Sequence, residues 1–177
     1  DVVLLERTEL TSGSTWHAAG LLPLFNMSYT VGQLHKYSVD LYKRLPAETG
    51  QDVSFHVTGN LRLATCRDRM DEYRKYCGTA NTIGVPFQLI SPAEVKELWP
   101  LVNLGGDADT PAVIGALYHP DDGHIAPADL TMALRRAARS AGAEINEQTE
   151  VTGAVQMPSG EWKLTTNRGE ITAEHVV

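Results

Sequence analysis

Residues 2–20, VVLLERTELTSGSTWHAAG, decide the fold of this chain. The apolar run Val2–Leu5 is typical of a buried strand, and an acidic residue, Glu6, follows it directly. A carboxylate at the end of a parallel strand can accept hydrogen bonds from the hydroxyls of a ribose, as in dinucleotide-binding folds. The stretch therefore predicts an α/β fold in which Glu6 binds a nucleotide, with an ordinary strand-end carboxylate as the alternative. Arg7 either supports the adenosine or is solvated.

The loop after this strand offers little side-chain bulk, so its backbone can approach a planar cofactor closely. Its small residues are Gly13, Ser14, Ala18, Ala19 and Gly20. Ser14 and Thr15 can donate hydrogen bonds to a diphosphate or to a ring edge, or can instead cap a helix. His17 is the reactive group of the loop, because a neutral imidazole nitrogen is a nucleophile. From the residues alone, a histidine beside Trp16 is more often structural than reactive.

These residues also carry a family resemblance. Residues 4–22, LLERTELTSGSTWHAAGLL, resemble the flavin-attachment segment of the dimethylglycine and sarcosine dehydrogenases of the D-amino-acid-oxidase superfamily. In that family the histidine of TWHAAG bonds covalently to FAD. The likeness continues along nearly the whole chain, through ETGQDVSFHVTGNLRLAT (48–65), SPAEVKELWPL (91–101) and YHPDDGHIAPADLTMALRRAAR (118–139).

The resemblance implies that His17 is the covalent attachment point of FAD. It further implies a role for Val151, in the strand-like stretch TEVTGAV, because the backbone at this family position meets the adenine; plain sheet core is the alternative. The full set of expected cofactor-binding residues is Glu6, Arg7, Gly13, Ser14, Thr15, Trp16, His17, Ala18, Ala19, Gly20, Leu21 and Val151.

The expected architecture is a partial Rossmann-like FAD-binding fold with an inserted module of antiparallel sheet and helices on the substrate side. Residues of about 1–30 and 125–177 are predicted to form the FAD-binding portion, and about 31–124 the inserted module. No G-x-G-x-x-G turn is present, and both ends fall in strand-like sequence. We therefore expect a piece of a longer polypeptide, with a glycine-rich turn upstream and weak FAD binding by the piece alone.

Periodicity and turn residues predict the remaining elements. Helices are expected over 30–48, with Leu34, Tyr37, Leu41 and Leu45 at helical spacing, and over 67–83, with Gly84 as the stop. A short helix is expected from Ser91 to Trp99, where Ser91 and Glu94 predict a capping box. The last helix is expected over 127–141, with Leu130, Leu134, Ala137 and Ala141 on its apolar face. Strands are expected over 55–57 and 60–65, around a turn at 58–59, and over 87–90 and 113–118. The alternation within 60–63 predicts a sheet exposed to solvent on one face. Strands are expected over 143–147, 150–157, 162–166 and 171–177, interpreted as a meander that lies between a parallel strand and the returning final strand.

Composition and motifs exclude several other classes of protein. The net charge is −7, and the 15 basic residues are dispersed, which argues against nucleic-acid binding. No apolar run is long enough to span a membrane. His119, Asp121, Asp122 and His124 match no known ligand spacing, so no metal is expected, and His35 and His56 are placed on helix and strand surfaces. Cys66 and Cys77 are expected to be buried or half-buried free thiols in a reducing compartment.

The function implied by the resemblance is FAD-dependent oxidation of an N-methyl group of dimethylglycine or sarcosine. The resulting imine would pass to tetrahydrofolate, in a domain outside this chain, or be hydrolysed to formaldehyde. The family's proton-handling and carboxylate-binding residues are expected beyond Val177. The alternatives are a non-catalytic scaffold of the same fold and a flavoenzyme for another secondary or tertiary amine. We expect a cytoplasmic protein in a bacterium or a matrix protein in mitochondria; the electron acceptor is not defined.

Overall fold

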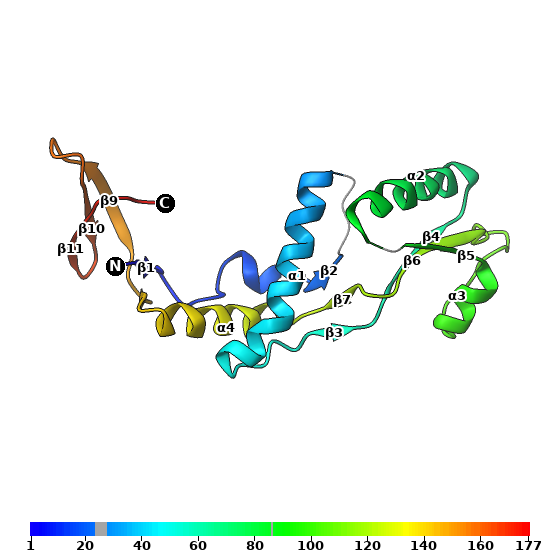
Figure 1. Cartoon of the computed structure of the whole chain (residues 1–177), viewed down its shortest axis with the longest axis horizontal. Coiled ribbons are helices and arrows are strands. Elements are labelled where there is room, and N and C mark those ends of the chain that lie inside the picture. The colour runs from blue at the N-terminus through cyan, green and yellow to red at the C-terminus, as the bar shows by residue number, and fades with distance from the viewer. Residues whose placement is uncertain (24–27, 86) are drawn as a thin grey trace. The chain divides into compact units, whose positions relative to one another are not determined.

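The computed structural model describes residues 1–23, 28–85 and 87–177 (Figure 1). Helices and strands mix throughout, which confirms the predicted α/β class. The chain forms two compact units: residues 1–19, 45–53 and 126–177 make up the first, and residues 20–44 and 54–125 the second. The assignment of cofactor and substrate roles to the segments around 1–30, 31–124 and 125–177 stays a prediction.

The first unit contains a parallel strand pair at the predicted nucleotide-binding strand. β1 (Val3–Leu5) pairs in parallel with β8 (Glu144–Asn146), and the ladder continues where the Glu6 N–H donates to Asn146 O at 2.9 Å. Parallel pairing requires a crossover connection, and the helix that precedes β8 is α4 (Pro127–Ser140). The α4 helix contacts β8 and the short 3-10 helix η1 (Ser14–His17).

The buried face of α4 differs from the predicted one. Leu134 is 41% exposed, whereas Ala133, one position earlier, is fully buried. A helix is rotated about its axis until the residues that fit its neighbours face them, and the small Ala133 side chain allows a closer approach than leucine would. The period of the sequence therefore predicted the helix correctly and its packing side only in part, because Leu130 and Ala137 are half-buried whereas Leu134 and Ala141 are exposed.

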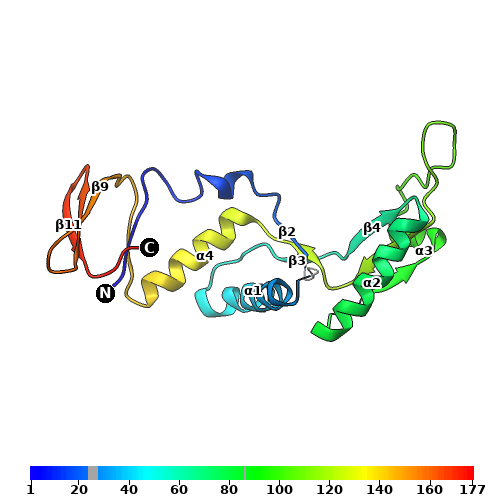
Figure 2. The same ribbon diagram turned by 90° about the horizontal axis from the view of Figure 1, so that it is seen from above.

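The C-terminal part of the first unit is an antiparallel meander in the strand order β11-β10-β9. Its strands are β9 (Val151–Gln156), β10 (Trp162–Thr166) and β11 (Gly169–Ala173). Figure 2 shows it in orange and red. The predicted last strand over 171–177 is wrong in its bounds, because pairing with β10 begins at Gly169 and ends at Ala173.

The second unit is built around an antiparallel sheet in the order β4-β6-β5, with β6 in the centre. The sheet and its helices comprise β4 (Asn60–Ala64), α2 (Arg67–Ile83), β5 (Gln88–Ile90), α3 (Pro92–Leu98) and β6 (Gly115–His119). Helices α2 and α3 lie on opposite sides of it (Figure 1). Tyr73 of α2 packs with Leu117 on one face, and Val95 of α3 packs with Ala116 on the other. The predicted solvent-exposed face is therefore wrong, because α2 covers the face that carries Arg62, whose guanidinium lies over the Tyr76 ring of α2.

A smaller sheet in the order β2-β7-β3 completes this unit. It consists of β2 (Leu21–Leu22), β3 (His56–Val57) and β7 (Gly123–His124). The predicted strands on either side of residues 58–59 do not pair with each other: β3 pairs with β7, and β4 pairs with β6. Between the two ladders, the N–H groups of Thr58 and Gly59 donate to Asp122 O at 3.2 and 2.8 Å.

The long helix α1 (Tyr29–Thr49) confirms the helix predicted over 30–48. The side of α1 that is buried differs in part from the side that the helical spacing of its apolar residues predicts. Leu45 is buried, but Leu34 and Tyr37 are exposed, and Val39 takes the buried position. No helix within residues 1–23, 28–85 and 87–177 combines the length and apolar character of a bilayer-spanning segment.

The N-terminus of α3 has the predicted capping box, and it provides a pH-dependent test. Glu94 Oε2 accepts from the N–H and the Oγ of Ser91, both at 2.7 Å, and these hydrogen bonds lower the pKa of Glu94 below its ordinary 4.5. A lowered pKa in the folded state means that the stabilisation is present above pH 4.5 and is lost as the pH falls through the lowered value.

We therefore expect Glu94→Ala to destabilise the intact protein at neutral pH, with the difference from wild type shrinking in acid. The measurement is the hydrogen-exchange protection of α3 amides in both proteins across this pH range. The matched control is Glu97→Ala, because Glu97 lies in the same helix outside the capping box. A deficit for Glu94→Ala that stayed constant into acid would contradict the assignment.

Candidate functional site

The predicted cofactor loop forms a short turn of helix, η1, that presents its residues outward. The Trp16 N–H donates to Gly13 O, and the Ala18 N–H to Thr15 O, each at 3.2 Å. Gly13 precedes the helix and no side chain caps it, so the alternative in which Ser14 or Thr15 is a helix cap is not what the structure forms. The hydroxyl of Ser14 is thus left exposed.

Exposure of large side chains distinguishes this loop from an ordinary surface turn. Trp16 is 75% exposed, and η1 has no buried residue. The side chain of His17 is exposed and forms no hydrogen bond within the described part of the chain. The backbone at Gly13 is also open, because an added Cβ there would meet nothing within 4 Å. An exposed indole beside an accessible imidazole fits a surface that a planar ring system covers.

Glu6 is held in a defined position at the end of β1. Its Oε1 accepts from the Thr8 N–H at 2.8 Å and from Thr8 Oγ1 at 3.1 Å. Its backbone is fixed by the β1–β8 ladder and by the Thr149 N–H, which donates to Glu6 O at 2.8 Å. Within the described residues, no hydrogen bond involves Oε2 of Glu6, so this oxygen is available to a ribose hydroxyl.

The loop is fastened to α4 by a residue that sequence reasoning missed, Glu147. Its Oε1 accepts from the Leu10 N–H at 2.9 Å, and its Oε2 lies 3.3 Å from Arg135 Nη2 on α4. The Arg135–Glu147 ion pair is only partly exposed, and it ties together segments far apart in sequence. No local pattern could have revealed it, because Leu10 and Glu147 are separated by 137 positions.

The other predicted site residues divide between the two units. Val151 lies in the first unit at the start of β9, an edge strand of the meander, and is 43% exposed, which contradicts its alternative reading as plain sheet core. Arg7 is exposed in the same unit, as are Ala18 and Ala19. Gly20 and Leu21 belong to the second unit, where Gly20 O accepts from the Ile125 N–H at 2.9 Å.

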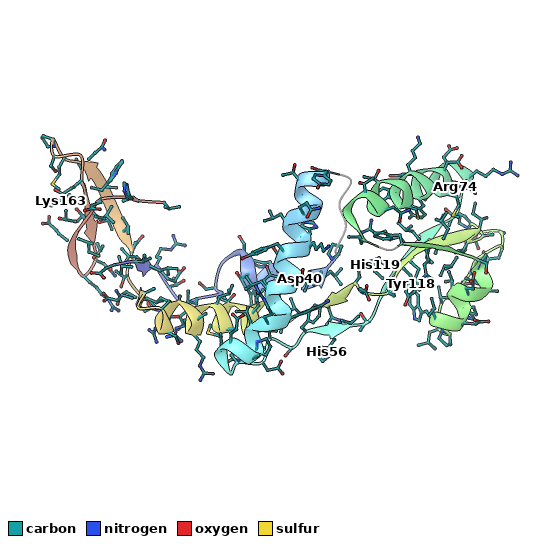
Figure 3. All side chains as sticks on the ribbon, viewed as in Figure 1. Asp40, His56, Arg74, Tyr118, His119 and Lys163 are labelled. Atoms are coloured by element: carbon teal, nitrogen blue, oxygen red, sulfur yellow. The ribbon has the colours of Figure 1, made fainter. Side chains whose placement is uncertain are left out.

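The second unit also contains a buried histidine–carboxylate pair. His119 Nδ1 lies 2.7 Å from Asp122 Oδ1, with the two side chains 0% and 1% exposed (Figure 3). Phe87 packs on the His119 ring at 4.7 Å between centroids. His119 is the last residue of β6, and Asp122 directly precedes β7. No cluster of three or more potential metal ligands occurs in the described residues.

The remaining histidines and the cysteines behave partly as predicted. His56 is exposed, as expected, and stacks on His124 at 5.1 Å between ring centroids. His35, by contrast, is half-buried rather than on a helix surface, because its side chain faces a cavity. Both cysteines are free thiols, as predicted, and Cys77 is half-buried, which raises its pKa. The prediction that Cys66 is buried or half-buried is wrong, because Cys66 is exposed.

Comparison with protein families gives one match over the entire chain. The family described as DAO, FAD dependent oxidoreductase, matches residues 1–177.

Three relatives illustrate the range of proteins that the chain resembles. It is 41% identical to mitochondrial dimethylglycine dehydrogenase of Rattus norvegicus, over 100% of this chain and 20% of the relative. Its identity to mitochondrial sarcosine dehydrogenase of Homo sapiens is 40%, over 85% of this chain and 16% of that protein. It is 33% identical to the mitochondrial pyruvate dehydrogenase phosphatase regulatory subunit of Mus musculus, over 100% of this chain and 20% of that protein. The chain thus spans about a fifth of the length of such relatives.

A solved structure agrees with this fold. The L-proline dehydrogenase of P. horikoshii superimposes with a TM-score of 0.85 at 31% identity, covering 96% of this chain and 43% of that protein.

Proposed function

The chain belongs to the DAO family of FAD-dependent oxidoreductases, and from this premise we propose that it carries FAD bonded covalently to His17. The observation that carries the proposal is the exposed imidazole of the TWHAAG loop, which forms no hydrogen bond within the described residues. A nucleophilic nitrogen that is accessible and uncommitted meets the requirement for forming a bond to a cofactor. The intact protein would then keep its flavin permanently.

The residues around His17 supply the other contacts that the cofactor needs. Glu6 offers the free oxygen of its carboxylate to the ribose. The hydroxyls of Ser14, which is exposed, and Thr15, which is half-buried, can donate to the diphosphate or to the edge of the flavin. Trp16 provides a flat apolar surface. The further contacts come from Arg7, Gly13, Ala18, Ala19, Gly20, Leu21 and the backbone of Val151.

When bound, the flavin supplies the redox chemistry, accepting a hydride equivalent from the carbon next to the amine nitrogen. The protein supplies position: the Glu147 contacts to Leu10 and Arg135 hold the loop against α4, so that His17 is presented from a fixed backbone. Proton handling at the substrate, and any tetrahydrofolate that takes up the one-carbon unit, are assigned to parts of the protein outside these residues.

The substrate class that we propose is a small N-methylated glycine, dimethylglycine or sarcosine. Support comes from the two dehydrogenases that act on these amines, at 41% and 40% identity. A eukaryotic source would place the protein in the mitochondrial matrix, since both relatives are mitochondrial, and a bacterial source in the cytoplasm.

Anaerobic mixing of the intact holoprotein with each amine tests the substrate class. We expect dimethylglycine or sarcosine to bleach the visible absorbance of the flavin within the time of mixing, and unmethylated glycine to leave it largely unchanged. Proline serves as the comparison amine, because the structural relative from P. horikoshii is named for it. If proline bleached the flavin and neither methylated glycine did, the N-methylglycine assignment would be wrong.

A second candidate is a non-catalytic subunit that keeps the fold without the cofactor. It is favoured by the 33% identity over the whole chain to a protein named as a regulatory subunit. An intact protein that is colourless as purified, and stays colourless after incubation with FAD, would establish this candidate against the first.

A further inference from the structure

The second unit contains a cavity of about 170 Å³ between α1 and the segment that includes β2. Its walls combine four apolar side chains with three polar ones: Leu21, Leu22, Pro23 and Val39, and His35, Ser38 and Tyr42. A cavity with apolar walls and a few convergent polar groups is the usual form of a small-molecule site. At roughly 30 Å³ for each water, this volume holds five or six waters, or one small amino acid.

His35 is the residue that points to a ligand. Its Nδ1 is buried and has no hydrogen-bond partner among the described residues. A buried polar atom left without a partner costs free energy, so proteins rarely retain one unless water, an ion or a ligand satisfies it. The neighbouring Ser38 donates its hydroxyl proton to Leu34 O at 2.8 Å, and no hydrogen bond joins it to His35 Nδ1 in the described residues.

The polar lining favours an anion over a cation. The described residues that line the cavity include no carboxylate, so an ammonium group would find no opposite charge among them. The His35 Nδ1, when it carries its proton, and the Tyr42 hydroxyl are both hydrogen-bond donors, and a carboxylate is an acceptor for two donors at once. The apolar wall formed by Leu21, Leu22 and Val39 suits methyl and methylene groups.

We propose that this cavity binds the carboxylate end of a small aliphatic acid, with His35 Nδ1–H and the Tyr42 hydroxyl as the donors. The identity of this acid as an N-methylated amino acid rests on the proposed function. The cavity wall at Leu21 follows the TWHAAG loop directly in the sequence. This places a carboxylate contact inside the chain, in addition to those that the family resemblance puts beyond Val177.

The test is the binding of methoxyacetate to the intact protein by isothermal titration calorimetry. Methoxyacetate keeps the carboxylate of sarcosine but has an ether oxygen in place of the amine, so the protein cannot oxidise it as an amine. We expect His35→Ala to weaken binding by about tenfold or more, since a hydrogen bond to a charged group is lost, and Tyr42→Phe to weaken it by several-fold. Lys36→Ala, the adjacent exposed position on α1, is the matched control and should bind as wild type.

The uncharged analogue methoxyacetamide separates recognition of the carboxylate from filling of the cavity, and we expect it to bind at least about tenfold more weakly than the acid. Equal binding of methoxyacetate by wild type and by both His35→Ala and Tyr42→Phe would overturn the proposal. If His35→Ala fails to fold, as judged by circular dichroism, Tyr42→Phe and the amide analogue still decide it.

Two different measurements separate this proposal from the proposed function: methoxyacetate affinity reports on the cavity, and flavin fluorescence on a denaturing gel reports on the covalent bond to His17. His35→Ala is expected to retain flavin fluorescence on a denaturing gel while losing affinity for methoxyacetate. A wild-type protein that binds methoxyacetate through His35 but carries no flavin would refute the proposed function and support the cavity.

Discussion

Replacing His17 with alanine in the intact protein will abolish the flavin fluorescence that stays with the polypeptide in a denaturing gel. The expected effect is all or none, because a covalent tether through the imidazole cannot form without its nitrogen. Loss of the side chain should disturb the fold little, since His17 is exposed and forms no hydrogen bond with the described residues. The measurement is in-gel fluorescence under ultraviolet light, followed by protein staining of the same gel.

His56→Ala is the matched control for this experiment. His56 is also an exposed histidine, but it lies on β3 outside the TWHAAG loop, so its variant should keep the full fluorescent signal. Free flavin migrates with the dye front after denaturation and does not confuse the result. A His17→Ala protein as fluorescent as wild type would show that the tether, if there is one, uses another residue.

Gly123→Ala is expected to be strongly destabilising, because the added methyl group would meet backbone atoms of a neighbouring strand. Gly123 lies on β7, the central strand of the β2-β7-β3 sheet. An ideal Cβ there would sit 3.0 Å from the carbonyl carbon of His56 and closer still to its oxygen. Because the obstruction is backbone, it cannot be relieved by a side-chain rotation, and the β3–β7 ladder must open. We expect a loss of about 3 kcal/mol or more in the free energy of unfolding.

The matched control adds the same methyl group at a glycine that has room for it. Gly78 lies inside α2, and an added Cβ would meet nothing within 4 Å. Gly78→Ala should therefore stabilise the protein by roughly 0.5–1 kcal/mol, because alanine loses less conformational freedom in a helix than glycine does. Urea unfolding followed by tryptophan fluorescence compares both variants with wild type. Similar midpoints for the two variants would mean that Gly123 is not closely packed.

Local structure could be predicted because local interactions determine it. The helix over 67–83 begins and ends where its periodicity and Gly84 place it, and Gly84 has the left-handed conformation, with φ of 74°, that favours glycine. The capping box at Ser91 and Glu94 forms as its spacing predicts. The strands β2 and β7 were not predicted, because a strand of two residues has no period to detect.

The candidate site also has parts that the sequence could predict and parts that it could not. The TWHAAG loop and the carboxylate after β1 could be found in the sequence, because their residue types and spacing are contiguous. The half-buried position of His35 could not, since helical spacing placed it on a surface and only the packing of α1 beside β2 encloses it. Glu147 was missed for a similar reason, because its partners come from residues 10 and 135.

By itself, the sequence determined the α/β class, the extent of the longer helices and the family to which the chain belongs, because each depends on residues that are neighbours along the chain. Tertiary structure alone decided which side of each helix is buried, as with Ala133 in place of Leu134, and which strands pair. It also decided that Glu147 holds the loop after β1 through the Leu10 N–H. The physical reason is that burial and long-range hydrogen bonds depend on partners brought together only by folding, and no spacing within one segment specifies them.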